Sequence, residues 1–80
     1  MAGYPRHWAF DEVYDSVDQG CGDFIIDLAG VMRELAPGSV LMIASRDAGA
    51  PVEIPAWCRM TGHSLLDALP PFYLVRRRNE

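Results

Sequence analysis

Cys21 is the residue with the clearest capacity for chemistry, because it stands between turn-forming residues and an apolar pattern of helical spacing. Its neighbours Gly20, Gly22 and Asp23 belong to that turn. A free thiol has a pKa of about 8.5, and the N-terminus of a helix lowers this pKa because it favours the anion. A cysteine in this position is therefore suited to nucleophilic attack and to thiol exchange.

Two features of the sequence act on the Cys21 thiolate in opposite directions. The backbone N–H groups of Gly22 and Asp23, at the start of the expected helix, can face the sulfur. The carboxylates of Asp18 and Asp23 disfavour a second negative charge close by. Residue type and position alone do not show which of these two effects on the thiolate is larger. They also fit an alternative in which Cys21 is a small residue in a turn with no chemical role.

Cys58 is the second cysteine, and it shares an apolar helical stripe with Ile54, which predicts a buried core thiol. The alternative is a second thiol that resolves a disulfide with Cys21, which requires the second helix to start or end near the start of the first. No Cys-x-x-Cys or His-x-x-x-His spacing relates the cysteines to His7 or His63. We therefore expect no metal site, and no Gly-x-Ser-x-Gly or phosphate-loop motif points to a hydrolase or a nucleotide enzyme.

The 80 residues are expected to form a single domain, 1–80, because a chain this short has no material for a second core. Half of the residues are apolar, which is the balance of an ordinary globular protein. The sequence leaves open whether residues 1–8 are ordered. These residues lack the apolar core of a secretion signal, and no apolar run is long enough to span a bilayer, so we expect a cytoplasmic protein without membrane partners.

The formal net charge of −4 argues against a protein that binds nucleic acid directly through its whole surface. The exception to this acidic character is the run Arg76, Arg77 and Arg78 near the end of the sequence. Exposure of the last strand to solvent is sufficient to explain these three arginines. The alternative is that they contact an acidic partner protein.

Apolar periodicity predicts two helices. The first runs from about Asp23 to Leu35, where apolar residues recur at helical spacing until Pro37 and Gly38 end the pattern. The second runs from Val52 to Thr61 and requires Pro55 to lie in its first turn or at its start.

Four segments have the character of strands. The clearest is Ser39–Ser45, an apolar run typical of an interior strand, in which alternate residues point to opposite faces of a sheet. The other three are Trp8–Val17, His63–Leu69 and Phe72–Arg77. The resulting order β-α-β-α-β-β predicts an α+β fold, a two-layer α/β sandwich with both helices packed on one face of a four-stranded mixed sheet.

Two segments carry a resemblance to a known family. Ile54–Leu66 reads Ile-Pro-Ala-Trp-Cys-Arg-Met-Thr-Gly-His-Ser-Leu-Leu, and Leu35–Leu41 reads Leu-Ala-Pro-Gly-Ser-Val-Leu. Both resemble segments of the TusA-like sulfur-carrier proteins, and they occur in the same order. The spacing from Cys21 to the Pro-Gly pair is also similar to that after the active cysteine of these proteins. The resemblance covers about Asp15 to Arg77.

The resemblance implies a sandwich similar to the carboxy-terminal domain of translation initiation factor three. It also implies that Cys21 carries sulfane sulfur as a persulfide, without a cofactor. The donor would be a protein of the cysteine desulfurase or rhodanese type. The acceptor protein would act in tRNA thiolation, molybdenum cofactor assembly or sulfur oxidation.

The sequence departs from the family at the site itself, where Cys21-Gly22-Asp23-Phe24 replaces Cys-Pro-x-Pro. Proline fixes φ and holds the cysteine at the helix start, whereas glycine loosens the backbone and restores an N–H that can face the sulfur. Two functions are therefore expected in competition. One is a relay sulfurtransferase in which Cys21 is the nucleophile, and the other is a non-catalytic binding or regulatory module that keeps the fold.

Overall fold

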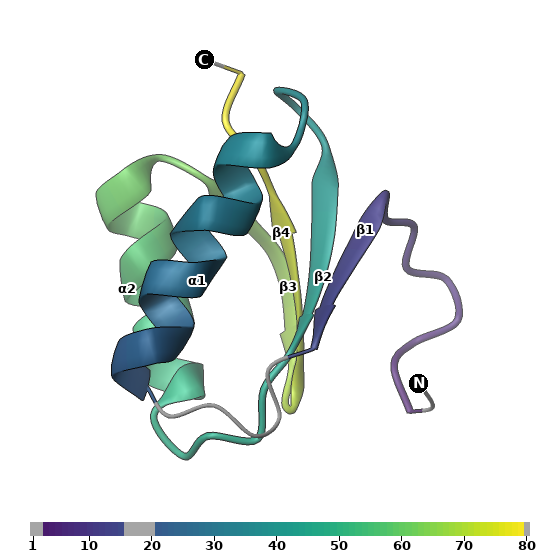
Figure 1. Ribbon diagram of the computed structural model, residues 1–80. Coiled ribbons are helices and arrows are strands. Elements are labelled where there is room, and N and C mark those ends of the chain that lie inside the picture. The colour runs from purple at the N-terminus through teal and green to yellow at the C-terminus, as the bar shows by residue number, and fades with distance from the viewer. Residues whose placement is uncertain (1–2, 16–20, 80) are drawn as a thin grey trace.

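The computed structural model describes residues 3–15 and 21–79, and over residues 21–27 it describes the backbone alone. The element order is β-α-β-α-β-β, as predicted. The elements are β1 (Glu12–Asp15), α1 (Cys21–Glu34), β2 (Val40–Ala44), α2 (Ala50–Thr61), β3 (Ser64–Leu69) and β4 (Phe72–Arg76), shown in Figure 1.

The four strands form one mixed sheet in the order β1-β2-β4-β3. β1 and β2 are parallel, whereas β4 is antiparallel to both β2 and β3. Because β1 and β2 run in the same direction, α1 has to carry the chain back along the sheet between them. As a result, α1 and α2 both begin at the end of the molecule where β1 and β2 finish (Figure 1).

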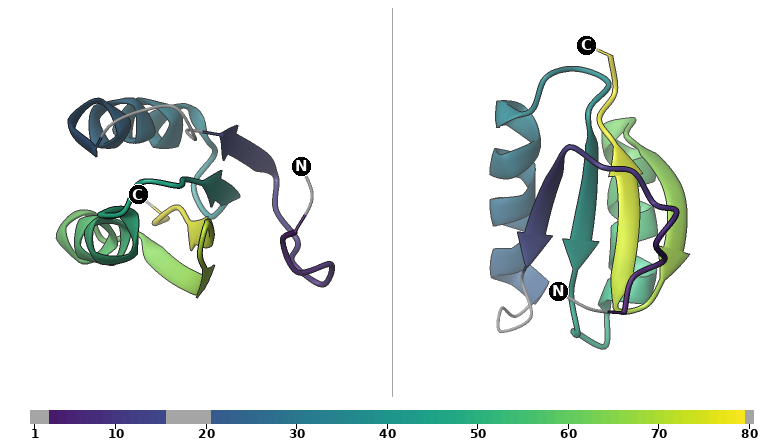
Figure 2. Two further views of the ribbon diagram at one scale, coloured as in Figure 1. Left: turned by 90° about the horizontal axis from the view of Figure 1, so that it is seen from below. Right: turned by 90° about the vertical axis from the view of Figure 1, so that its right-hand side faces the viewer.

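Both helices cover the same face of the sheet, as predicted (Figure 2). Alternate residues of β2 point to this face, and Leu41 and Ile43 are fully buried there. They pack with the apolar stripes of the two helices, which buries the core of the domain. The buried cluster consists of Leu28, Met32, Leu41, Ile43, Ala50, Ile54, Trp57, Cys58, Tyr73 and Val75.

The opposite face of the sheet is covered in part by residues 3–10, which cross it as an irregular segment (Figure 2). Trp8 is only 7% exposed, and its Nε1 donates a hydrogen bond to Oδ2 of Asp67 at 3.1 Å. The ring of Tyr4 meets that of Phe72 edge to face, with centroids 6.1 Å apart. A second buried cluster, made of Trp8, Met42, Ala44, Phe72 and Leu74, results.

The first strand is shorter than predicted. The expected range was Trp8–Val17, but β1 spans Glu12–Asp15, and Val17 lies outside the described residues. Trp8 and Phe10 belong instead to the segment that covers the outer face. Their apolar character reflects this additional layer, which a search for strand alternation does not distinguish from a strand.

The placement of Pro55 in the first turn of the second helix was wrong. α2 begins at Ala50, so Pro55 lies inside the helix, and Pro51 occupies the first turn instead. Proline is tolerated in a first turn because its missing N–H has no partner there. At Pro55 the missing N–H removes one bond of the helix. The burial of Ile54 and Trp57 on either side explains why the helix nevertheless continues.

Candidate functional site

Cys21 is the first residue of α1, which begins two residues earlier than predicted. The backbone N–H groups of this first turn, including those of Gly22 and Asp23, have no carbonyl partner within the helix. Together with the aligned peptide dipoles they favour negative charge at this end, which is the setting in which a thiol pKa falls. Asp18, expected to oppose this effect, lies outside the described residues, as does the side chain of Asp23.

The loop between β2 and α2 lies at the same end of the molecule as the start of α1, whose first residue is Cys21 (Figure 1). Ser45 is buried, its N–H donates to the carbonyl of Pro71 at 2.9 Å, and its Oγ accepts from the N–H of Asp47 at 3.3 Å. Oδ2 of Asp47 accepts from the N–H of Gly49 at 2.8 Å. These bonds hold the turn from which α2 starts. The N-terminus of α2 therefore has a fixed position at the same end of the molecule as the N-terminus of α1.

Cys58 lies in the core between α2 and the sheet. It is a free cysteine, 3% exposed, and burial raises the pKa of its thiol from 9.0 to about 11, although the charge of Arg59 partly opposes the shift. Burial disfavours the thiolate because the anion loses its solvation. Cys58 is therefore protonated at neutral pH and unsuited to attack.

The position of Cys58 along α2 also weighs against pairing with Cys21. α2 does begin at the Cys21 end of the molecule, as a resolving role requires (Figure 1). Cys58, however, follows Ala50 by eight residues, or about 12 Å along the helix axis. Bridged cysteines have Cα atoms within about 7 Å. The structure thus favours the core interpretation of this residue.

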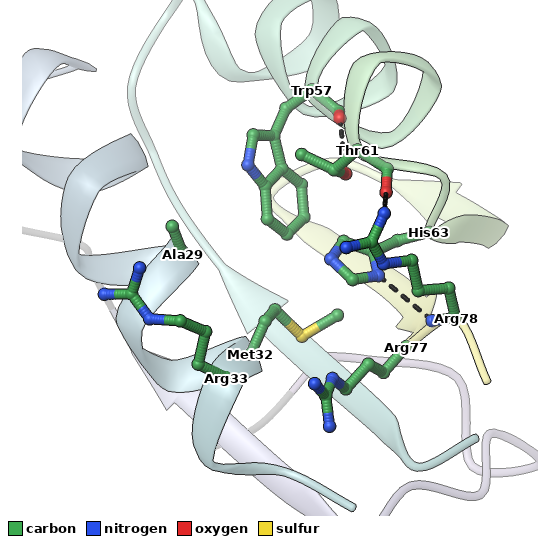
Figure 3. A pocket seen from close by; sticks show the side chains of 8 residues that line it. All are labelled: Ala29, Met32, Arg33, Trp57, Thr61, His63, Arg77 and Arg78. Atoms are coloured by element: carbon green, nitrogen blue, oxygen red, sulfur yellow. Dashed lines mark hydrogen bonds between the residues drawn. The ribbon is translucent and has the colours of Figure 1, made fainter. Parts of the chain in front are cut away.

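A group of residues that the sequence did not bring together lines a pocket near the C-terminal ends of the two helices (Figure 3). The sequence singled out Arg77 and Arg78 as part of a basic run but gave no reason to associate them with Arg33. Only the fold brings these segments to one place, since they lie more than 40 positions apart in the chain. The pocket is lined by Ala29, Met32, Arg33, Trp57, Thr61, His63, Arg77 and Arg78.

Two further kinds of site are absent from the described residues. No three His, Cys, Asp or Glu side chains of that part of the chain gather where they could hold a metal ion. In the same residues, neither helix is long and apolar enough to cross a bilayer.

Comparison with known proteins gives a consistent family. The family model for sulfurtransferase TusA matches residues 13–70. Putative sulfur carrier proteins of Neisseria meningitidis serogroups A and B are 37% identical over 57 residues, which cover 71% of this chain and 77% of each relative. The sulfur carrier protein TusA of Pseudomonas aeruginosa is 30% identical over 57 residues, 71% of this chain and 72% of its own length. With these matches and the fold described above, the chain belongs to the TusA family of sulfur carrier proteins.

Proposed function

We propose that the protein relays sulfane sulfur, carried as a persulfide on Cys21, from a donor protein to an acceptor protein. The observation that carries the proposal is the position of Cys21 as the first residue of α1. A helix N-terminus favours the thiolate, which is the reactive form of a cysteine. The names of the related sulfur carrier proteins support the same role.

The relay consists of two thiol exchanges that need no added oxidant or reductant. In the first, the Cys21 thiolate attacks the terminal sulfur of a donor persulfide. A bond forms between this sulfur and Sγ of Cys21, and the donor S–S bond breaks to release the donor thiolate. In the second, an acceptor thiolate attacks the same terminal sulfur, and the Cys21 thiolate leaves. The sulfane sulfur moves without a net change of oxidation state.

The N–H groups at the start of α1 assist both steps because they stabilise negative charge on Sγ of Cys21 when it attacks and when it leaves. Gly22 contributes an N–H that a proline at this position would lack. A donor of the cysteine desulfurase or rhodanese type fits this chemistry, since both present a persulfide, and the protein itself needs no cofactor.

The proposal is tested by loading the reduced protein and measuring its intact mass. One reaction contains a cysteine desulfurase with cysteine, and the other contains a rhodanese with thiosulfate. The expected result is the gain of one sulfur atom, which dithiothreitol removes. Cys21→Ser should abolish the gain, whereas Cys58→Ala, the matched control, should preserve it because Cys58 is buried.

The competing function is a binding or regulatory module that keeps the fold without sulfur transfer. A pKa of the Cys21 thiol at or above the free value, measured by the pH dependence of its alkylation, together with no loading from either donor, would establish that module and overturn the relay. A gain of sulfur that survives in Cys21→Ser would equally overturn the assignment of Cys21.

A further inference from the structure

The pocket near the C-terminal ends of α1 and α2 has a volume of about 360 Å³, within the range of sites for small molecules. Its walls come from both helices and from the segment that follows β4 (Figure 3). In α1 its lining begins at Ala29, eight residues after Cys21, or about 12 Å along the helix. The pocket is therefore separate from the proposed sulfur-carrying position.

Three arginines, Arg33, Arg77 and Arg78, belong to the lining of this pocket. Nη1 of Arg77 donates to the carbonyl of Leu35, and Nη1 of Arg78 donates to the carbonyl of Thr61 at 2.9 Å. These carbonyls lie at the C-terminal ends of α1 and α2, so each arginine caps a helix. A carbonyl oxygen does not neutralise a full positive charge, and a guanidinium has five donors. Both arginines therefore retain charge and donors for a ligand.

His63 adds a further donor. Its Nδ1 accepts a hydrogen bond from the backbone N–H of Arg78 at 3.0 Å, which leaves the proton of the neutral ring on Nε2. Burial lowers the pKa of His63, and the charges of Arg78 and Arg77 lower it further. The lowered pKa favours the neutral imidazole, so His63 offers its Nε2–H as a donor without adding a further positive charge.

The remaining wall is apolar. Met32 and Trp57 are only 2% and 6% exposed, and Ala29 lies beside Met32 on the α1 side (Figure 3). The hydroxyl of Thr61 is committed to the carbonyl of Trp57 at 2.7 Å. The side-chain groups left to orient a ligand are cationic or donating, and the body of the ligand would meet apolar side chains.

We propose that this pocket binds a small organic polyanion, whose carboxylate or phosphate groups contact Arg33, Arg77 and Arg78 while its apolar body packs against Met32 and Trp57. The guanidinium fork matches both oxyanions with paired hydrogen bonds. Three positively charged side chains in one lining also favour an anionic ligand. A carboxylate ligand and a phosphate ligand share this recognition chemistry.

The test is a titration of the ¹⁵N-labelled protein followed by NMR at constant ionic strength. The probes are benzene-1,3,5-tricarboxylate, benzoate with one carboxylate, and phenyl phosphate. The tricarboxylate should shift the indole N–H signal of Trp57 saturably and bind about tenfold more tightly than benzoate. The indole N–H of Trp8, on the opposite face of the sheet, should not move.

Arg33 and Arg59 provide matched variants, because each is an exposed arginine in the last turn of a helix and only Arg33 lines the pocket. Arg33→Gln should weaken tricarboxylate binding about tenfold, whereas Arg59→Gln should change it less than twofold. Neither residue caps a helix through the bonds described above, so both variants should fold.

Equal weakening in the two variants would overturn the proposal, because it would show general attraction to surface arginines rather than binding in the pocket. Absence of a saturable Trp57 shift with all three probes would overturn it as well. Saturation by a glutamate-rich peptide but by none of the three probes would assign the pocket to a segment of a partner protein. Tighter binding of phenyl phosphate than of benzoate would support the proposal and indicate phosphate as the preferred anion.

Discussion

The two cysteines occupy opposite kinds of position on a helix. Cys21 is the first residue of α1, where the N–H groups of a helix have no partner within it, whereas Cys58 lies in the core between α2 and the sheet, and burial raises its pKa to about 11. The proposed relay relies on this difference, because a helix start favours a thiolate whereas burial disfavours it. Sequence spacing was sufficient to predict both positions, because the start of a helix and its apolar stripe are local patterns.

Tyr73 illustrates a cost that the sequence does not reveal. Its side chain is almost fully buried, and its hydroxyl has no hydrogen-bond partner among the described residues. Burying such a hydroxyl costs free energy, whereas the ring itself packs in the core. Tyr73→Phe should therefore leave the free energy of unfolding unchanged or raise it by up to about 1 kcal/mol. Urea unfolding followed by circular dichroism measures this, and a loss of more than about 1 kcal/mol would reveal a missing partner.

At the scale of elements, order and type were predictable, but the extent of β1 and the starts of α1 and α2 were not. The helices and the interior strand β2 follow from apolar periodicity, which depends on neighbouring residues only. The extent of β1 was overestimated because Trp8 is apolar for a different reason, since it covers the outer face of the sheet. Pro55 was misplaced because the packing of its neighbours outweighs the local rule.

The two prolines of α2 provide an internal comparison. Pro55 lies inside the helix and Pro51 in its first turn. Pro55→Ala should restore a helix hydrogen bond and raise the free energy of unfolding by about 1 kcal/mol, because part of the roughly 3 kcal/mol cost of an interior proline is offset by greater freedom of the unfolded chain. Pro51→Ala should give no gain. Urea unfolding of both variants tests this, and equal changes would contradict it.

The segment 3–10 acts as a partial third layer, and Trp8 is its principal contact with the sheet. Trp8→Ala should lower the free energy of unfolding by about 3 kcal/mol, since it removes a large buried ring. Trp8→Phe keeps a ring but loses the bond to Asp67, so about 1 kcal/mol should be lost. Circular dichroism in urea distinguishes the two. Equal, negligible losses would show that the segment adds nothing to stability.

The whole molecule has two chemically different ends because its helices run in the same direction. The N-termini of α1 and α2 share the end that carries Cys21 (Figure 1). Their C-terminal ends are capped by Arg77 and Arg78, which complement the negative ends of the helix dipoles. The sequence could not predict the pocket at this second end, since its residues come from segments far apart in the chain that only the fold brings together.

Stability should be greatest between about pH 7 and 9, because the half-buried His63 limits it on the acid side and the buried Cys58 on the alkaline side. The pKa of His63 is lowered in the folded protein, first by burial and then by Arg78 and Arg77. The unfolded chain therefore binds a proton more readily, and stability falls as the pH drops below 6.5. Cys58 has the opposite effect, because it lowers stability as the pH rises. Its unfolded thiol ionises near pH 9.0 and its folded thiol near 11, so stability falls as the pH rises between these values.

The free energy of unfolding, measured in urea, should accordingly be higher at about pH 8 than at about pH 5.5 or 10.5. The alkaline loss due to Cys58 is of the order of 1–2 kcal/mol at pH 10.5, and the raised pKa of Tyr73 adds to it. Cys58→Ala should reduce the difference between pH 8 and 10.5, whereas His63→Gln should reduce only the difference between pH 8 and 5.5. Carboxylates titrate mainly below pH 5 and leave this comparison intact. Removal of a group that controls stability should also remove the pH dependence which that group causes. If the free energy of unfolding of each variant differed from that of the wild type by the same amount at every pH, neither His63 nor Cys58 would control the pH dependence of stability.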